Sequence, residues 1–234
     1  MRMKTVVLAL SLSLIGFTPK FSFADTLQLE TATGNTSGPD IYPYGFSIDG
    51  STSLTSLSCL NYNREITFGE EWNVTVTSLS SLLPTAVVDG SSDTALREDA
   101  YLDYYYNHTT VPGIGAVTNS ELQYAIWDIL DPSGVSGLTG LFDTTAQNLV
   151  YAAQGAAAGE TNAFLSQFTL FTPTTDQTGW TAGPPQQFLE FTPGTGNDSP
   201  PAVTPEPSSL ALLGTGFLGM VAMLRRRIAV PVKA

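Results

Sequence analysis

The 234-residue chain contains one cysteine, Cys59, and its side chain could form a covalent bond with that of Gln123. Exported proteins normally oxidise their cysteines in pairs, and both ends of this chain carry export features that are described below. A single thiol in such a protein is a buried structural residue, half of an intermolecular bridge, or a reactive group held in another bond. The third alternative is an internal thioester that joins the Cys59 sulfur to the acyl carbon of Gln123.

Both residues fall in segments that can position them. Cys59 lies in a short alternation of polar and apolar residues, 56–62, which predicts a strand. Gln123 lies on a predicted helix, beside an apolar stripe formed by Leu122, Ala125, Ile126, Ile129 and Leu130. Trp127 follows one turn later and provides an aromatic wall. If the two side chains face each other, the Cys59 thiolate can attack the carboxamide and expel ammonia, and a dry pocket would protect the product from hydrolysis.

Around these residues the sequence predicts an α+β fold rich in β-strands, an antiparallel sandwich or barrel with two to three short inserted helices. Alternating β-branched and aromatic residues predict strands at 45–49, 72–77, 164–172 and 186–192. Capping residues predict helices from Ser92 or Asp93 to Tyr106, from Asn119 or Ser120 to Asp131, and from Asp143 to Gln154. Segments rich in Gly, Pro and Thr predict linkers at 31–43, 172–185 and 193–207.

The N-terminus has the features of an export signal. Arg2 and Lys4 precede a mostly apolar run, 6–17. Ser22 and Ala24 then place small residues at the two positions that a signal peptidase recognises. We therefore expect residues 1–24 to be removed.

The C-terminus combines a short motif, an apolar run and a basic cluster. Pro205, Glu206 and Pro207 directly precede the run 208–224, which is followed by Arg225, Arg226 and Arg227. At about 1.5 Å per residue the run just crosses a hydrocarbon core, and the arginines keep its far end in the cytoplasm. This tail, 205–234, resembles the PEP-CTERM sorting signal of Gram-negative bacteria, which an exosortase processes during export to the envelope or the extracellular polymer matrix. The alternative is a plain transmembrane anchor.

The part of the chain between these ends is strongly acidic. Residues 25–204 contain twenty carboxylates but only Arg64 and Arg97 as basic residues with a permanent charge, which gives a formal net charge of −18. Such a surface repels phosphate backbones and excludes nucleic acid as a partner. The same segment contains no lysine. Composition alone can explain this, or the absence of side-chain amines protects a thioester while the negative field attracts a lysine-rich partner.

The segment around Gln123 resembles the thioester domains of Gram-positive surface adhesins, whose Thr-Gln-x-Ala motif is followed by an aliphatic residue and often by tryptophan. The matching positions are Gln123, Ala125, Ile126 and Trp127. The strand cysteine of that family, which an aliphatic residue usually follows, matches Cys59. The resemblance covers roughly 53–192 and implies a Cys59–Gln123 cross-link. The sequence departs from the family pattern at Leu122, which replaces the motif threonine, and at Ser58, where an aromatic residue often stands.

Other chemistry is weakly supported. His108, the only histidine, is typical of a capping or surface residue, although by analogy with complement thioester proteins it could accept the acyl group. With one histidine and no Gly-x-Ser-x-Gly motif, the sequence predicts no enzyme, no cofactor and no metal site. The acidic pairs Asp99/Asp103 and Glu70/Glu71 are more typical of a solvated helix or loop face than of a glycosidase site. A possible calcium loop lacks the specific ligand spacing; it contains Asp128, Asp131, Ser133 and Asp143.

The sequence thus divides into a signal peptide (1–24), a thioester-like β-rich domain (25–192), a Pro/Gly-rich linker (193–204) and a sorting signal (205–234). One predicted function is covalent adhesion at the cell envelope, cell surface or extracellular matrix of a Gram-negative bacterium, in which a lysine amine of a surface partner attacks the thioester. The alternative is a non-covalent matrix or carbohydrate-binding module in which Cys59 is structural. Its stacking surface would be supplied by Tyr101, Tyr104, Tyr105 and Tyr106.

Overall fold

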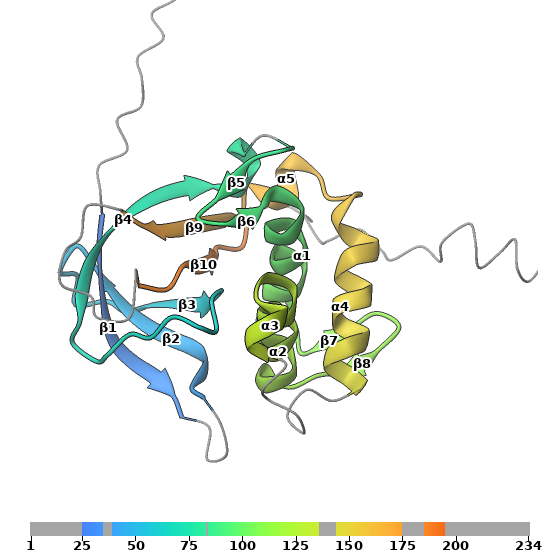
Figure 1. The fold of residues 1–234 in the computed structure, drawn as a ribbon, viewed down its shortest axis with the longest axis horizontal. Helices are drawn as coiled ribbons and strands as arrows, with labels where there is room; N and C mark the ends of the chain where they lie inside the picture. The colour runs from blue at the N-terminus through green and yellow to red at the C-terminus, as the bar shows by residue number, and fades with distance from the viewer. Residues whose placement is uncertain (1–24, 35–38, 83, 136–143, 175–184, 195–234) are drawn as a thin grey trace, which may run out of the picture.

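The computed structural model describes residues 25–34, 39–82, 84–135, 144–174 and 185–194. These residues form a closed antiparallel barrel with a layer of helices against one side (Figure 1). The predicted signal peptide, nearly all of the linker after residue 192 and the sorting signal lie outside the described residues. Within the described ranges, no helix has the length and apolar character needed to cross a membrane.

The barrel contains six strands, in the order β1–β2–β3–β10–β9–β4, and closes because β4 pairs with β1. The strands are β1 (Asp25–Thr33), β2 (Ile41–Ile48), β3 (Thr55–Cys59), β4 (Glu71–Ser78), β9 (Phe168–Pro173) and β10 (Phe188–Phe191). Period-two alternation is clear at the start of β4, where Trp72 and Val74 are buried and Glu71 and Asn73 are exposed. The predicted β-rich α+β fold with an antiparallel barrel is confirmed.

Aromatic side chains fill the barrel interior. The Phe46 ring lies edge-on to Trp72 and to Phe188, with ring centroids 5.8 Å and 4.5 Å apart. All three side chains are at most 2% exposed. Edge-to-face packing of this kind adds about 0.5–1.5 kcal/mol per pair beyond the burial of area, so these rings help to hold β2, β4 and β10 in register.

The helical layer is two helices deep. Helices α1 (Asp93–Tyr104) and α2 (Asn119–Leu130) lie between the barrel and α4 (Thr144–Ala157), as Figure 1 shows. Shorter elements are α3 (Pro132–Val135), α5 (Asn162–Leu165), the 3₁₀ turns η1 (Leu79–Ser81) and η2 (Tyr105–Asn107), and two small hairpins. The hairpins pair β5 (Val87–Val88) with β6 (Ser91–Ser92) and β7 (Thr110–Val111) with β8 (Gly115–Ala116).

Local sequence sets the starts of the two central helices. The Ser92 hydroxyl accepts a hydrogen bond from the Ala95 N–H at 3.2 Å and caps α1, as predicted. Helix α2 is capped by Thr118, one residue before the predicted position, because Thr118 and Glu121 form a reciprocal capping box. Pro132 directly follows Asp131, the C-cap of α2, and disfavours a helical conformation there.

Several sequence predictions of element bounds are wrong, among them the helix expected to end at Gln154, which runs to Ala157. The stretch 31–43 is not only a linker, since β1 runs to Thr33 and β2 begins at Ile41. The expected strand 164–172 begins only at Phe168, because Thr161 caps the short helix α5 ahead of it. Helix α1 ends at Tyr104 and passes into the η2 turn before residue 106.

Candidate functional site

The structure brings Cys59 and Gln123 together in the interior. Cys59 ends β3, Gln123 lies on α2, and both side chains are 0% exposed. The Gln123 side-chain Nε2 donates a hydrogen bond to the Cys59 main-chain oxygen at 2.7 Å, across a sequence separation of 64 residues. The carboxamide that the sequence singled out therefore lies against the residue that carries the thiol.

The Cys59 carbonyl lies beyond the end of the β2–β3 ladder. The β2–β3 ladder ends at the pair Tyr44–Leu57, two residues before Cys59. A buried carbonyl without a partner is costly, and the Gln123 amide supplies the missing donor from the helical layer.

Tyr106 holds the other end of the carboxamide. Its hydroxyl donates to Gln123 Oε1 at 3.0 Å, and its ring stacks on Tyr42 with centroids 3.9 Å apart. Burial, followed by the nearby Asp103 carboxylate, raises the Tyr106 pKa well above its ordinary value, so the hydroxyl remains a donor at neutral pH. A donor aimed at a carboxamide oxygen polarises the acyl carbon toward attack.

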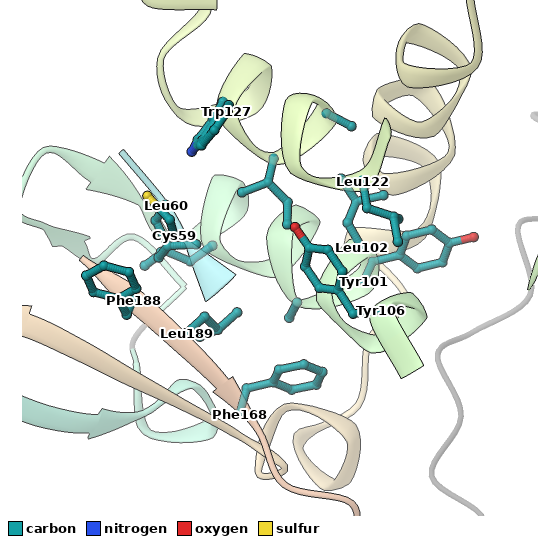
Figure 2. Packing of buried hydrophobic residues seen from close by; sticks show 14 of the residues in the cluster. Cys59, Leu60, Tyr101, Leu102, Tyr106, Leu122, Trp127, Phe168, Phe188 and Leu189 are labelled. Atoms are coloured by element: carbon teal, nitrogen blue, oxygen red, sulfur yellow. The ribbon is translucent and has the colours of Figure 1, made fainter. Parts of the chain in front are cut away.

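The Cys59 thiol is unreactive as an isolated group. Burial raises its pKa to about 12, and only weak contacts oppose this rise. The thiol donates to the Asn61 carbonyl at 3.5 Å, and the Trp127 indole N–H is close enough to favour the thiolate but forms no regular hydrogen bond with it. In Figure 2 Cys59 lies between Trp127 and Phe188. Any reaction of this sulfur therefore depends on its neighbours.

The other predicted supporting residues are placed as follows. Ala125, Ile126 and Trp127 are buried on α2 at 2% exposure or less. His108 is exposed at the end of η2, where its ring stacks on Tyr104 at 3.9 Å and its Nδ1 lies 2.6 Å from the Tyr104 carbonyl oxygen. A role for His108 in acyl transfer stays a prediction.

The tyrosine cluster does not form an open stacking surface. Tyr101, Tyr105 and Tyr106 are at most 6% exposed, and Tyr104 is half-buried among other rings. These residues of α1 and η2 pack in or against the hydrophobic core, so the sequence-based expectation of a tyrosine platform for glycans is wrong. Within the described ranges, no group of three or more His, Cys, Asp or Glu side chains could hold a metal ion.

The acidic pair Asp99/Asp103 is also buried, and the prediction of a solvated face is wrong. Asp99 is 0% exposed and Asp103 is 2% exposed. Burial raises the pKa of Asp103 from 3.8 to about 7 and that of Glu160, near Asp99, from 4.5 to about 8. These carboxyls are therefore held in their neutral form at mildly acidic pH.

This burial predicts that the protein is more stable in acid than at neutral pH. Between about pH 4 and pH 8 the unfolded chain releases protons from Asp103 and Glu160 that the folded chain retains, so the free energy of unfolding falls as pH rises. We expect the melting temperature of the Cys59→Ala variant, in which no thioester contributes, to drop by several degrees over this range. Adding Asp103→Asn should flatten the profile, whereas Glu71→Gln, at an exposed site on β4, should not. A melting temperature that rises with pH would contradict this expectation.

Comparison with known proteins gives two findings. A model of the PEP-CTERM protein-sorting motif matches residues 203–227, which confirms the predicted sorting motif and implies processing by an exosortase-type enzyme. Among solved structures, the N-terminal thioester domain of a surface protein from Clostridium perfringens aligns with a TM-score of 0.45 and 12% identity, covering 72% of this chain and 98% of that one. No curated protein matches the chain.

Proposed function

We propose that this protein is an exported, non-enzymatic adhesin that forms a Cys59–Gln123 thioester and uses it to attach covalently to a lysine amine on a surface partner. The observation that carries the proposal is the position of the Gln123 carboxamide, which hydrogen bonds hold between the Cys59 carbonyl and the Tyr106 hydroxyl in a site without solvent exposure. A buried carboxamide next to the only thiol of the chain has the parts that thioester formation requires.

Formation of the bond needs no outside reagent. The Cys59 sulfur bonds to the Gln123 acyl carbon, the bond from that carbon to Nε2 breaks, and the thiol proton leaves with the nitrogen as ammonia. Charge that develops on Gln123 Oε1 is stabilised by the Tyr106 hydroxyl, which already donates to this atom. The dry surroundings then slow hydrolysis of the thioester.

In the attachment step the Cys59 sulfur, which was the nucleophile in thioester formation, becomes the leaving group. A neutral amine on the partner bonds to the Gln123 acyl carbon, the bond from that carbon to sulfur breaks, and the amine proton returns to the sulfur, so the Cys59 thiol is released. The product is an amide, which is far more stable than the thioester. The formal charge of −18 on residues 25–204 favours encounter with a lysine-rich surface.

The sorting motif supports the location that this function requires. A PEP-CTERM motif at 203–227 supports processing by an exosortase-type enzyme during export. We propose that the processed protein acts at the envelope, surface or extracellular matrix of a Gram-negative bacterium, with residues 1–24 and part of the tail removed.

Intact mass spectrometry of the purified exported protein tests the thioester. We expect a mass one ammonia below that of the processed sequence, no thiol labelling after denaturation, and recovery of the thiol on methylamine treatment. Gln123→Met should show the full sequence mass and a labelled thiol. Gln187→Met removes another fully buried glutamine and should keep the mass deficit. Full mass with a free thiol in the unmodified protein would exclude the proposed bond.

A further inference from the structure

An open cavity shares two of its lining residues with the surroundings of Cys59. It measures about 440 Å³ and is bordered by β1, the start of β2, the segment 62–68 after β3, and Trp127 of α2. Tyr44 and Trp127 line this cavity, and both also interact electrostatically with the Cys59 thiol. Tyr44 and Trp127, each no more than 5% exposed, thus belong both to the cavity lining and to the surroundings of the sulfur.

The charged side chains that line this cavity carry a net negative charge. Its charged lining residues are Asp40, Arg64 and Glu65. The Arg64 guanidinium is already paired with Asp89 and also donates to the Pro185 carbonyl at 3.2 Å. The ion pairs found within the described ranges are Arg64–Asp89 and Arg97–Asp93, which leaves Asp40 and Glu65 without a basic partner there. The cavity thus offers two exposed carboxylates to a cation from outside.

The inner wall of the cavity is aromatic. Tyr62 and Trp127 lie with ring centroids 5.1 Å apart and planes inclined by 59°, and both line the cavity. Aromatic faces pack against methylene groups and attract ammonium and guanidinium ions. Aromatic rings at the inner wall and carboxylates among the lining residues suit a ligand with an aliphatic stem and a cationic head.

We propose that this cavity binds a lysine side chain of the partner protein, with its methylene stem against Tyr62 and Trp127 and its ammonium group attracted by Asp40 and Glu65. The inference rests on the proposed function for the step that follows, which is attack of the deprotonated amine on the Gln123 acyl carbon. Because Cys59 and Gln123 are fully buried, that step requires movement of the side chains that cover them, with Tyr44 and Trp127 as the ones that also line the cavity. Specificity for a cationic amine thus arises before the covalent step, at residues outside the Cys–Gln pair.

Binding can be measured in a chain that forms no thioester. We propose to titrate the exported protein carrying Cys59→Ala with N-acetyl-lysine methylamide and to follow the Trp127 indole N–H signal by NMR, assigned with Trp127→Phe. We expect a saturable shift with a midpoint on the order of 1 mM, and a much smaller response to the norleucine analogue, which has the stem without the charge. Spermidine tests whether any polyamine binds equally well.

Variants then locate the site. Asp40→Asn with Glu65→Gln should weaken lysine binding roughly threefold to tenfold, as expected for two exposed charge contacts. The control, Glu30→Gln with Glu71→Gln, removes two exposed carboxylates that do not line the cavity and should leave binding within about twofold, since neither contributes to the lining.

Any of these results would overturn the assignment: no saturable shift, an equal response to the norleucine analogue, or equal loss of affinity in both double variants. Tighter binding of spermidine than of the lysine amide would also overturn it, in favour of a free polyamine ligand. Intact mass of the unmodified protein decides the thioester separately, so either proposal can fail without the other.

Discussion

Replacing Tyr106 with phenylalanine is expected to slow formation of the Cys59–Gln123 bond by roughly 10²-fold or more. The substitution keeps the ring that stacks on Tyr42 and removes only the hydroxyl that donates to Gln123 Oε1. Loss of one buried donor to a developing oxyanion typically costs about 10²–10³-fold in rate. The measurement is the time course of ammonia loss, followed by intact mass after the denatured chain is refolded.

The matched control for this experiment is Tyr101→Phe. Tyr101 is as deeply buried as Tyr106, but its hydroxyl interacts with Tyr105 and not with Gln123. It should therefore form the bond at the rate of the unmodified chain. Melting temperatures of both variants show whether a slow rate reflects a damaged fold. If the folded Tyr106→Phe variant matches the unmodified chain in rate, Tyr106 has no part in the chemistry.

Opening the thioester with methylamine is expected to lower the free energy of unfolding by about 4 kcal/mol. The bond joins residues 64 positions apart and so restricts a long loop in the unfolded chain, for which the chain-entropy estimate gives this magnitude. For a domain of this size the loss corresponds to a drop in melting temperature of roughly 10 °C. Scanning calorimetry before and after treatment measures it.

The Cys59→Ala variant separates this effect from any direct action of the amine. It contains no thioester, so methylamine should leave its melting temperature unchanged, and that temperature should resemble the one of the treated protein. Identical stability of the treated and untreated unmodified protein would mean that the bond is absent or that it does not constrain the unfolded chain.

The sequence predicted the elements that have a clear local pattern and the two residues that have unusual chemistry. Alternation of apolar and polar residues identified the segments that become β3 and β4, and capping residues identified α1 and α2 to within two residues. Cys59 and Gln123 were singled out because a sole thiol is unusual in an exported protein, and the structure places them in direct contact. Strand β1 carried the same kind of signal, because Leu27 and Leu29 alternate with polar residues, but it was not identified.

Features assembled from distant segments could not be predicted. Tyr106 appeared only as one of four adjacent tyrosines, and nothing in the local sequence indicates that its hydroxyl meets a side chain 17 residues later. The burial of Asp99 and Asp103 depends on the packing of the helical layer against the barrel, whereas a pair of acids four residues apart on a helix is usually solvated. The cavity combines residues of β1, β2, α2 and a loop, so it exists only in the folded chain.

The order of these elements along the chain has a mechanical consequence. For a protein that is held by its C-terminal tail and bonded to a target at Gln123, tension enters at α2 and leaves after β10. The covalent path between those two points includes α4 and β9, while β1 to β4 lie outside it. Pulling would therefore unfold α4 and separate β9 from its neighbours first. The captured target would then be held by an extended segment of chain, while α1 and four barrel strands bear no direct force.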